Sequence, residues 1–207
     1  MKKVYPLSPI NGGLANWAGG LAVDFGTKVL VNYDGKSLKW LHTGMSGKGV
    51  MAGWSKGLAV DLGPSGLWNY NGTTWARINV NRPDVRGLAA WSGGLAADFG
   101  GTKGLWSYDG TDWKSIHTGN PGDGGIAGWT NGLVADFDSN GLWNYDGTTW
   151  TKLSAWNAGK GGVSEWSGGL MVDFDGRGLW NFDGEVWRRL ISGIDAEALS
   201  AVSWPGK

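Results

Sequence analysis

The stretch GIAGWTNGLVADFDSNGLWNYDGTTWTKL, residues 125–153, decides the fold. It contains four short runs in which apolar or aromatic residues tend to alternate with small or polar ones, as half-buried β-strands require. These runs are 126–129, 132–137, 142–145 and 149–153. Asp146-Gly147 separates the last two runs, and Asp-Gly in this setting is the strongest short-range signal for a β-hairpin. The stretch therefore predicts a four-stranded antiparallel sheet.

The same pattern recurs along the chain every 37 or 38 residues. The tryptophans that end the first run of each copy carry the period: Trp17, Trp54, Trp91, Trp129, Trp166 and Trp204. One copy is too short to bury a core alone, so we expect the copies to fold together as one domain over 1–207. The expected repeats are 14–50, 51–87, 88–125, 126–162 and 163–200. Short antiparallel meanders at a fixed period favour a β-propeller of about five four-stranded blades over a parallel solenoid.

The two ends of the chain complicate the strand count. Val4-Tyr5-Pro6-Leu7 matches the end of a fourth strand, and Ala201-Val202-Ser203-Trp204 matches a first strand. The sequence thus predicts 22 strands, where five whole blades need 20. We favour five blades in a ring closed by a terminal strand. The alternatives are six blades with one incomplete or swapped blade, and pairing of the terminal strands between subunits, because an uncovered edge strand invites another chain.

Composition limits the partners that can be expected. Lys and Arg together number 18, Asp and Glu also number 18, and the formal net charge is zero, so we expect no nucleic-acid partner. Cys is absent, and no run approaches the roughly 18 apolar residues of a membrane helix. The start MKKVYPLSPINGG lacks the apolar run of a signal peptide. The chain as given is expected to be soluble, not inserted in a membrane, and cytoplasmic by default.

The segment GLWNYDGTTWTKL at 141–153 resembles the strand pair of kelch-type and related bacterial propeller repeats, and similar segments stand at 66–78 and 104–116. This resemblance supports a propeller and carries no function. The short blades and Trp-rich hairpins also look like those of the propeller lectins of bacteria and invertebrates, which bind carbohydrates. No sugar-contacting residue set of a lectin family matches this sequence, so none is transferred.

Three repeated positions are candidate ligand-binding residues. The first is the tryptophan that ends the first run, which we expect at the face of the ring: Trp17, Trp54, Trp91, Trp129 and Trp166. Tryptophan has an apolar body and one N–H donor, so it suits sugar stacking as well as a core. The second is the aspartate seven residues later: Asp24, Asp61, Asp98, Asp136 and Asp173. A buried carboxylate that accepts hydrogen bonds from turn amides or an indole is the structural alternative, and it is the one we favour.

The third position is an asparagine in the third run: Asn69, Asn144 and Asn181, with Asn32 in the first copy and Ser107 in the odd one. Its side chain could bind sugar hydroxyls or satisfy the adjacent Asp-Gly turn, and we favour the turn.

Other chemistry finds little support. Asp136-x-Asp138-x-Asn140-Gly141 echoes the start of a calcium loop, but the distal Glu is missing, so we expect an ordinary turn and no metal. His42 and His117 are read as exposed loop histidines. No nucleophile elbow, phosphate loop or paired carboxylates are apparent, so we expect neither an enzyme nor a cofactor. If the chain were an enzyme, its divergent loops 79–87 and 154–162, the second with an extra Trp156, would be the places to look.

These observations lead to one functional prediction and one alternative. The prediction is a multivalent, non-enzymatic binding module with equivalent sites in every blade and glycans or glycoconjugates as partners. Several weak sites on one rigid scaffold would gain avidity. The alternative is a structural or protein-interaction scaffold without a small-molecule ligand, with a designed or reconstructed origin left open.

Overall fold

A computed structural model describes residues 13–26, 29–43, 49–160 and 162–193. The chain divides into two compact units, Met1–Pro83 and Asp84–Lys207. The first unit holds two four-stranded sheets and the second holds three. Both units are built from the same hairpins, so the reasons for the fold are the same in each.

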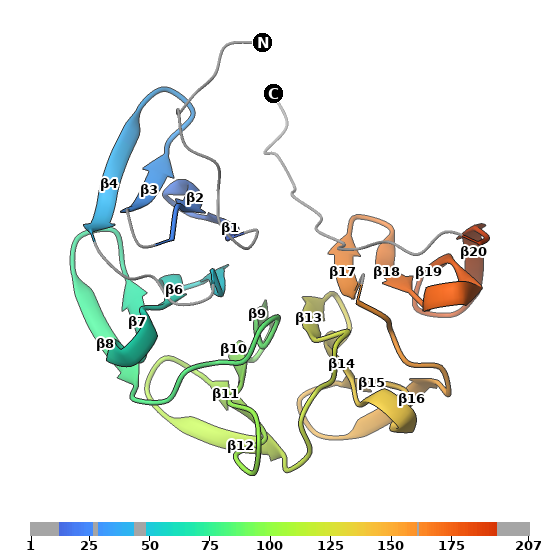
Figure 1. The fold of residues 1–207 in the computed structure, drawn as a ribbon. Coiled ribbons are helices and arrows are strands. Elements are labelled where there is room, and N and C mark those ends of the chain that lie inside the picture. The colour runs from blue at the N-terminus through green and yellow to red at the C-terminus, as the bar shows by residue number, and fades with distance from the viewer. Residues whose placement is uncertain (1–12, 27–28, 44–48, 161, 194–207) are drawn as a thin grey trace. The chain divides into compact units, whose positions relative to one another are not determined.

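The strands of the first unit form two sheets in sequence order (Figure 1). The first sheet consists of β1 (Leu14–Trp17), β2 (Gly20–Asp24), β3 (Val29–Tyr33) and β4 (Leu38–Thr43). The second consists of β5 (Met51–Trp54), β6 (Gly57–Asp61), β7 (Leu67–Tyr70) and β8 (Trp75–Asn79).

The second unit repeats this arrangement three times. Its sheets consist of β9 (Leu88–Trp91), β10 (Gly94–Asp98), β11 (Leu105–Tyr108) and β12 (Trp113–His117); β13 (Ile126–Trp129), β14 (Gly132–Asp136), β15 (Leu142–Tyr145) and β16 (Trp150–Ser154); and β17 (Val163–Trp166), β18 (Gly169–Asp173), β19 (Leu179–Phe182) and β20 (Trp187–Ile191). Among the described residues, the helical segments are three 3-10 turns: η1 (Gly63–Ser65), η2 (Asp138–Asn140) and η3 (Asp175–Arg177).

The predicted all-β fold with five four-stranded antiparallel blades is confirmed. Each sheet begins at the first residue of a predicted repeat, at residues 14, 51, 88, 126 and 163. The terminal strands predicted at 4–7 and 201–204 lie outside the described residues, so the count of 22 strands, the closure of the ring and the single domain remain predictions.

Tight turns set the register of every hairpin. In the fourth repeat, Trp129 pairs with Gly132 across the first hairpin, and Tyr145 pairs with Trp150 across the last. Gly132 has φ +131°, and a Cβ added there would meet the carbonyl oxygen of Tyr145 on the next strand. Only glycine accepts this combination of backbone angle and close approach, which explains why each second strand begins with glycine.

The third and fourth strands of every sheet share one irregularity. Their pairing shifts register at the same place in each repeat: Leu30/Val31, Leu67/Trp68, Leu105/Trp106, Leu142/Trp143 and Leu179/Trp180. A β-bulge of this kind bends the strand and increases its local twist. We therefore expect the fourth strand of each blade to be bent at this point.

Neighbouring sheets within a unit pack face to face through repeated apolar side chains. The second strands supply Leu58, Leu133 and Leu170, each 0% exposed. Burying one such side chain contributes about 1.5–3 kcal/mol. Fourth-strand tryptophans add hydrogen bonds between sheets: the Trp150 indole donates to the Ile116 carbonyl at 3.0 Å, and the Trp75 indole donates to the Leu41 carbonyl at 3.3 Å.

The first strands bring neighbouring sheets closest together. Strand β13 lies beside β9 (Figure 1), and β5 lies beside β1. A Cβ added to Gly128 would collide with the Ala90 carbonyl oxygen, and one added to Gly53 would collide with that of Asn16. This close approach explains why β5, β9 and β13 carry only Ala and Gly between their apolar ends.

Gly128→Ala should therefore destabilise the protein. The added methyl group would collide with a backbone atom, which has no alternative rotamer. Overpacking of this kind lowers the free energy of unfolding by about 1–3 kcal/mol. Gly176→Ala is the matched control, because a Cβ at Gly176 meets nothing within 4 Å. Urea unfolding of both variants measures the difference. Equal midpoints for the two variants would contradict the close approach of β9 and β13.

Candidate functional site

The tryptophan that ends each first strand is held by a hydrogen bond to the third strand of its own sheet. The indole N–H donates to an asparagine Oδ1 at 2.7 Å in four sheets. The pairs are Trp17–Asn32, Trp54–Asn69, Trp129–Asn144 and Trp166–Asn181. Two of the three predicted binding positions are thus brought together in each of these sheets, and they bind each other.

The asparagine amide also has a second partner. Nδ2 of Asn32, Asn69 and Asn144 donates to the carbonyl of Gly19, Lys56 and Asn131 respectively, at 2.6, 3.0 and 3.1 Å. These carbonyls belong to the turn between the first two strands. The expectation that asparagine satisfies the Asp-Gly turn is therefore wrong, because the aspartate of that turn serves it instead: Asp146 Oδ1 accepts the amides of Thr148 and Thr149 at 2.7 and 2.8 Å.

The repeated tryptophans differ in how much of the side chain reaches solvent. Trp54 and Trp129 are buried, with 8% and 6% exposed, whereas 44% of Trp166 is exposed. Trp17 and Trp91 are half-buried. Positions that look equivalent in the sequence are therefore not equivalent at the surface.

The third sheet departs from the common pattern, because Ser107 stands where the other sheets have asparagine. Ser107 Oγ accepts the Trp91 indole N–H at 3.2 Å, which keeps the tryptophan bond. A hollow of about 500 Å³ lies beside Trp91, and Ser107 is one of its lining residues. We call this hollow the Trp91 groove. Ser107, which the sequence marked only as the odd residue of the series, lines it.

Aromatic and charged side chains from two neighbouring sheets line the Trp91 groove. Tyr145 of the next sheet lies with its ring centroid 5.5 Å from that of Trp91. Three carboxylates and one ammonium group complete the lining: Asp109, Asp112, Asp146 and Lys114. Sequence reasoning missed these residues, because only the packing of adjacent sheets brings Tyr145 and Asp146 to Trp91.

The repeated aspartates are buried at the ends of the second strands. Each is between 0% and 2% exposed: Asp24, Asp61, Asp98, Asp136 and Asp173. Amides of the following turn donate to four of these carboxylates: Gly26 to Asp24, Gly63 to Asp61, Gly100 to Asp98 and Asp138 to Asp136. This is the structural role that the sequence favoured. Binding of a ligand by these aspartates stays a prediction.

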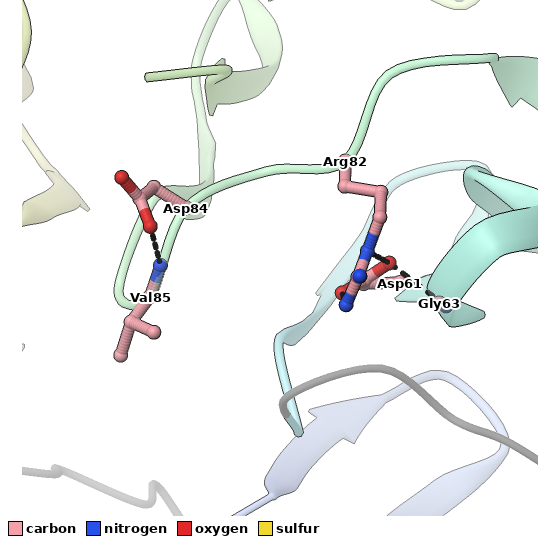
Figure 2. A network of polar contacts seen from close by, with 5 residues as sticks. All are labelled: Asp61, Gly63, Arg82, Asp84 and Val85. Atoms are coloured by element: carbon pink, nitrogen blue, oxygen red, sulfur yellow. Dashed lines mark hydrogen bonds and ion pairs between the residues drawn. The ribbon is translucent and has the colours of Figure 1, made fainter. Parts of the chain in front are cut away.

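In the first unit, a cation accompanies one of the buried aspartates. Arg82 Nε and one terminal nitrogen donate to the two oxygens of Asp61 at 3.1 and 3.0 Å (Figure 2). Gly63 N donates to the same carboxylate at 3.0 Å. A bidentate pair of this kind is one of the stronger charge-assisted contacts, so it ties the end of the first unit to its second sheet.

Two buried aspartates of the second unit have raised pKa values. Burial raises the pKa of Asp136 to about 7, assisted by the charge of Asp138 and opposed by the amides of Gly124, Ala158 and Asp138. Burial raises the pKa of Asp98 to about 6, with the Gly100 amide opposing it. These carboxyl groups therefore hold protons at pH values where an exposed aspartate would not.

The string from Asp136 to Gly141, which echoes the start of a calcium loop, and the two histidines are the residues to consider for a metal. No three histidine or acidic side chains of the described chain gather closely enough to hold a metal ion. Asp138 and Asn140 form the turn η2. The expectation that His42 and His117 are exposed loop residues is wrong. They are half-buried residues of β4 and β12 that pack against aromatic rings, and the ring centroids of His117 and Phe137 are 4.1 Å apart.

Where the structure describes the chain, no helix has the length and hydrophobicity needed to cross a membrane.

Comparison with protein-family models finds no match, and comparison with curated proteins finds none. Among solved structures, the chain is similar to PorZ, a surface component of the type IX secretion system of Porphyromonas gingivalis, with 18% identity and a TM-score of 0.37. The match covers 87% of this chain, which spans only 28% of the PorZ chain. The kelch and lectin resemblances therefore stay predictions.

The raised pKa values predict how stability depends on pH. Between about pH 4, the usual range of an aspartate, and pH 7, the folded protein binds more protons at Asp136 than the unfolded chain does. The free energy of unfolding should therefore fall as pH rises through this window. Asp136→Asn should flatten that slope, as measured by urea unfolding between pH 5 and 8.

Asp146→Asn is the control for this experiment. Turn amides lower the pKa of the exposed Asp146, so its stabilising contribution is complete above the unfolded pKa and is lost only in more acidic solution. The slope between pH 5 and 8 should be unchanged in this variant. A wild-type slope that Asp136→Asn leaves intact would contradict the assignment.

Proposed function

We propose that the chain is a non-enzymatic binding module whose ligand is a carbohydrate, bound in the Trp91 groove. The observation that carries the proposal is a hollow of about 500 Å³ beside the half-buried Trp91, in the sheet where Ser107 replaces the common asparagine. A repeated β-sheet fold of this kind is typical of binding and scaffold modules. The groove gives one place where binding can be tested.

The chemistry of the groove suits a sugar. Trp91 and Tyr145 offer apolar ring surface for the C–H face of a pyranose. Asp109, Asp112 and Asp146 can accept hydrogen bonds from hydroxyl groups, and Lys114 can donate to a ring or carbonyl oxygen. Because carboxylates outnumber cations here, we expect an uncharged or amine-bearing sugar rather than an acidic one.

The absence of catalysis is part of the proposal. Glycoside hydrolysis needs one carboxyl group with a raised pKa to act as the acid. The amides of Thr149 and Thr148 hold the pKa of Asp146 below its usual range. Asp109 Oδ1 likewise accepts the amides of Thr111 and Asp112, at 2.7 and 2.9 Å, so in both carboxylates Oδ1 is the oxygen that accepts the turn amides.

Equivalent sites in every blade remain part of the proposal, with the differing exposure of the tryptophans as a constraint. Trp17 and Trp166 are more accessible than Trp54 and Trp129, so any further sugar sites of this kind are expected at the first two. Two or more weak sites on one chain would raise the avidity for a branched or surface-bound glycan.

A protein-interaction scaffold is the second candidate, and exposed apolar side chains on the last hairpin favour it. Val186, Leu190 and Ile191 are 50%, 51% and 45% exposed. Side chains of this kind in the last hairpin of the described chain could serve as a contact for another protein.

Ser107→Asn should abolish sugar binding. The substitution places the residue of the other repeats in the groove, so it fills the hollow while keeping the indole hydrogen bond. A glycan array identifies a ligand for the wild type, and calorimetry then compares the variants. Trp91→Ala should weaken binding at least about tenfold, or about 1.4 kcal/mol.

Asn69→Ser is the matched control, because it makes the reverse change in a sheet outside the groove. This variant should keep wild-type affinity for the sugar. Retained affinity in Ser107→Asn would show that the groove is not the site, and a wild type that binds no glycan would favour the scaffold.

A further inference from the structure

The linker between β16 and β17 carries a tryptophan where the preceding repeat has glycine. Trp156 occupies the position of Gly119, 37 residues earlier. Its side chain is 39% exposed. Its ring packs edge-on against Phe174 at 5.6 Å and against Trp180 at 5.7 Å between centroids. An exposed indole held in place by two other aromatic rings is a prepared contact surface.

Two arginines extend this aromatic cluster. The Arg177 guanidinium lies over the Trp156 ring at 4.5 Å, and the Arg189 guanidinium lies over Trp180 at 5.8 Å. Arg177 comes from the turn η3, where the preceding repeat has Asn140. Within the described part of the chain, neither guanidinium forms an ion pair, whereas the neighbouring Arg188 pairs with Asp183 at 2.9 Å.

A hollow of about 550 Å³ lies at this cluster, and Trp156, Asn157, Phe174, Asp175 and Arg177 line it. The one carboxylate of this lining, that of Asp175, lies against the backbone of Gly159 in the linker. The hollow thus combines ring surface, one amide, a guanidinium and a carboxylate that faces the linker. We call it the Trp156 hollow.

We propose that the Trp156 hollow binds an acidic saccharide, one that carries a carboxylate or a sulfate group. The indole offers apolar surface to the sugar ring. A guanidinium that stacks on an aromatic ring keeps its in-plane N–H groups for a bidentate contact with an anionic group. The cation–π contact restrains Arg177 beforehand, so less freedom is lost when the ligand binds.

The charge of the chain selects among the ligands that offer a flat face and an anion. Single-stranded nucleic acid offers both, but it needs a basic groove that follows the backbone. The chain has as many acidic as basic residues, 18 of each, and the hollow itself contributes a single cation. One anionic group per sugar matches this arrangement better than a continuous phosphate backbone.

This site is independent of the Trp91 groove. It lies on other residues, and its lining carries one carboxylate and one guanidinium, whereas the lining of the Trp91 groove carries three carboxylates and one ammonium group. A failure of sugar binding at Trp91 would therefore leave this proposal standing, and the reverse also holds.

Calorimetry with two families of probes tests the proposal. The probes are oligogalacturonate, which carries carboxylates, and sulfated dextran oligosaccharide, with unsulfated dextran oligosaccharide as the uncharged reference. We expect the wild type to bind at least one acidic probe at least tenfold more tightly than the uncharged reference. The two acidic probes decide between carboxylate and sulfate as the preferred group.

Two variants replace a residue of the hollow by the residue at the same position of the preceding repeat, so folding should be preserved. Trp156→Gly and Arg177→Asn should each weaken binding of the acidic probe at least tenfold, while Ser107→Asn should leave it unchanged. Circular dichroism and urea unfolding confirm that each variant is folded.

Several results would overturn the proposal. One is wild-type affinity for the acidic probe in folded Trp156→Gly. Others are equal affinity for the uncharged reference, complete competition by free acetate or inorganic sulfate at the probe's own concentration, and tighter binding of an oligothymidylate than of either acidic saccharide.

Discussion

The hydrogen bond from the first-strand indole N–H to a side-chain oxygen of the third strand is the contact that all five blades share, with asparagine as the acceptor in four of them and Ser107 in the third. It joins the last residue of the first strand to the third strand. The asparagine amide also donates to the turn between the first and second strands. One side chain therefore fixes three parts of the sheet at once. The partner ring of the next sheet then packs on a tryptophan that is already oriented, as Phe182 does on Trp129 at 5.9 Å.

Both candidate sites arise where a repeat departs from this common pattern. Ser107 shortens the side chain that holds Trp91, and Trp156 replaces a glycine of the preceding linker. The scaffold tolerates both changes because neither removes a strand pairing or a residue of the buried second strands. The repeated residues build the sheets, and the two hollows, which differ in charge, lie at positions where one repeat differs from the others.

The sequence predicted the sheets well because their determinants are local. Asp146-Gly147 and the glycine at the start of each second strand fix the hairpins through backbone geometry alone. The partner of Asn144 was mispredicted, because the sequence places it beside the Asp-Gly turn while the twisted hairpin brings the opposite turn within reach. Contacts between sheets, such as the Trp150 indole to the Ile116 carbonyl 34 residues earlier, depend on packing that no single repeat encodes.

The bulge between the third and fourth strands affects whether copies of the protein can associate through the edges of their sheets. The fourth strand is the last strand of its sheet, and its outer backbone groups could pair with a strand of another molecule. A bent strand cannot offer the straight, regularly spaced donors and acceptors that such pairing requires. Exposed cationic side chains such as Lys114 and Lys152 repeat along these strands and add like-charge repulsion. We therefore expect the bulge and these charges to oppose edge-to-edge aggregation of the sheets.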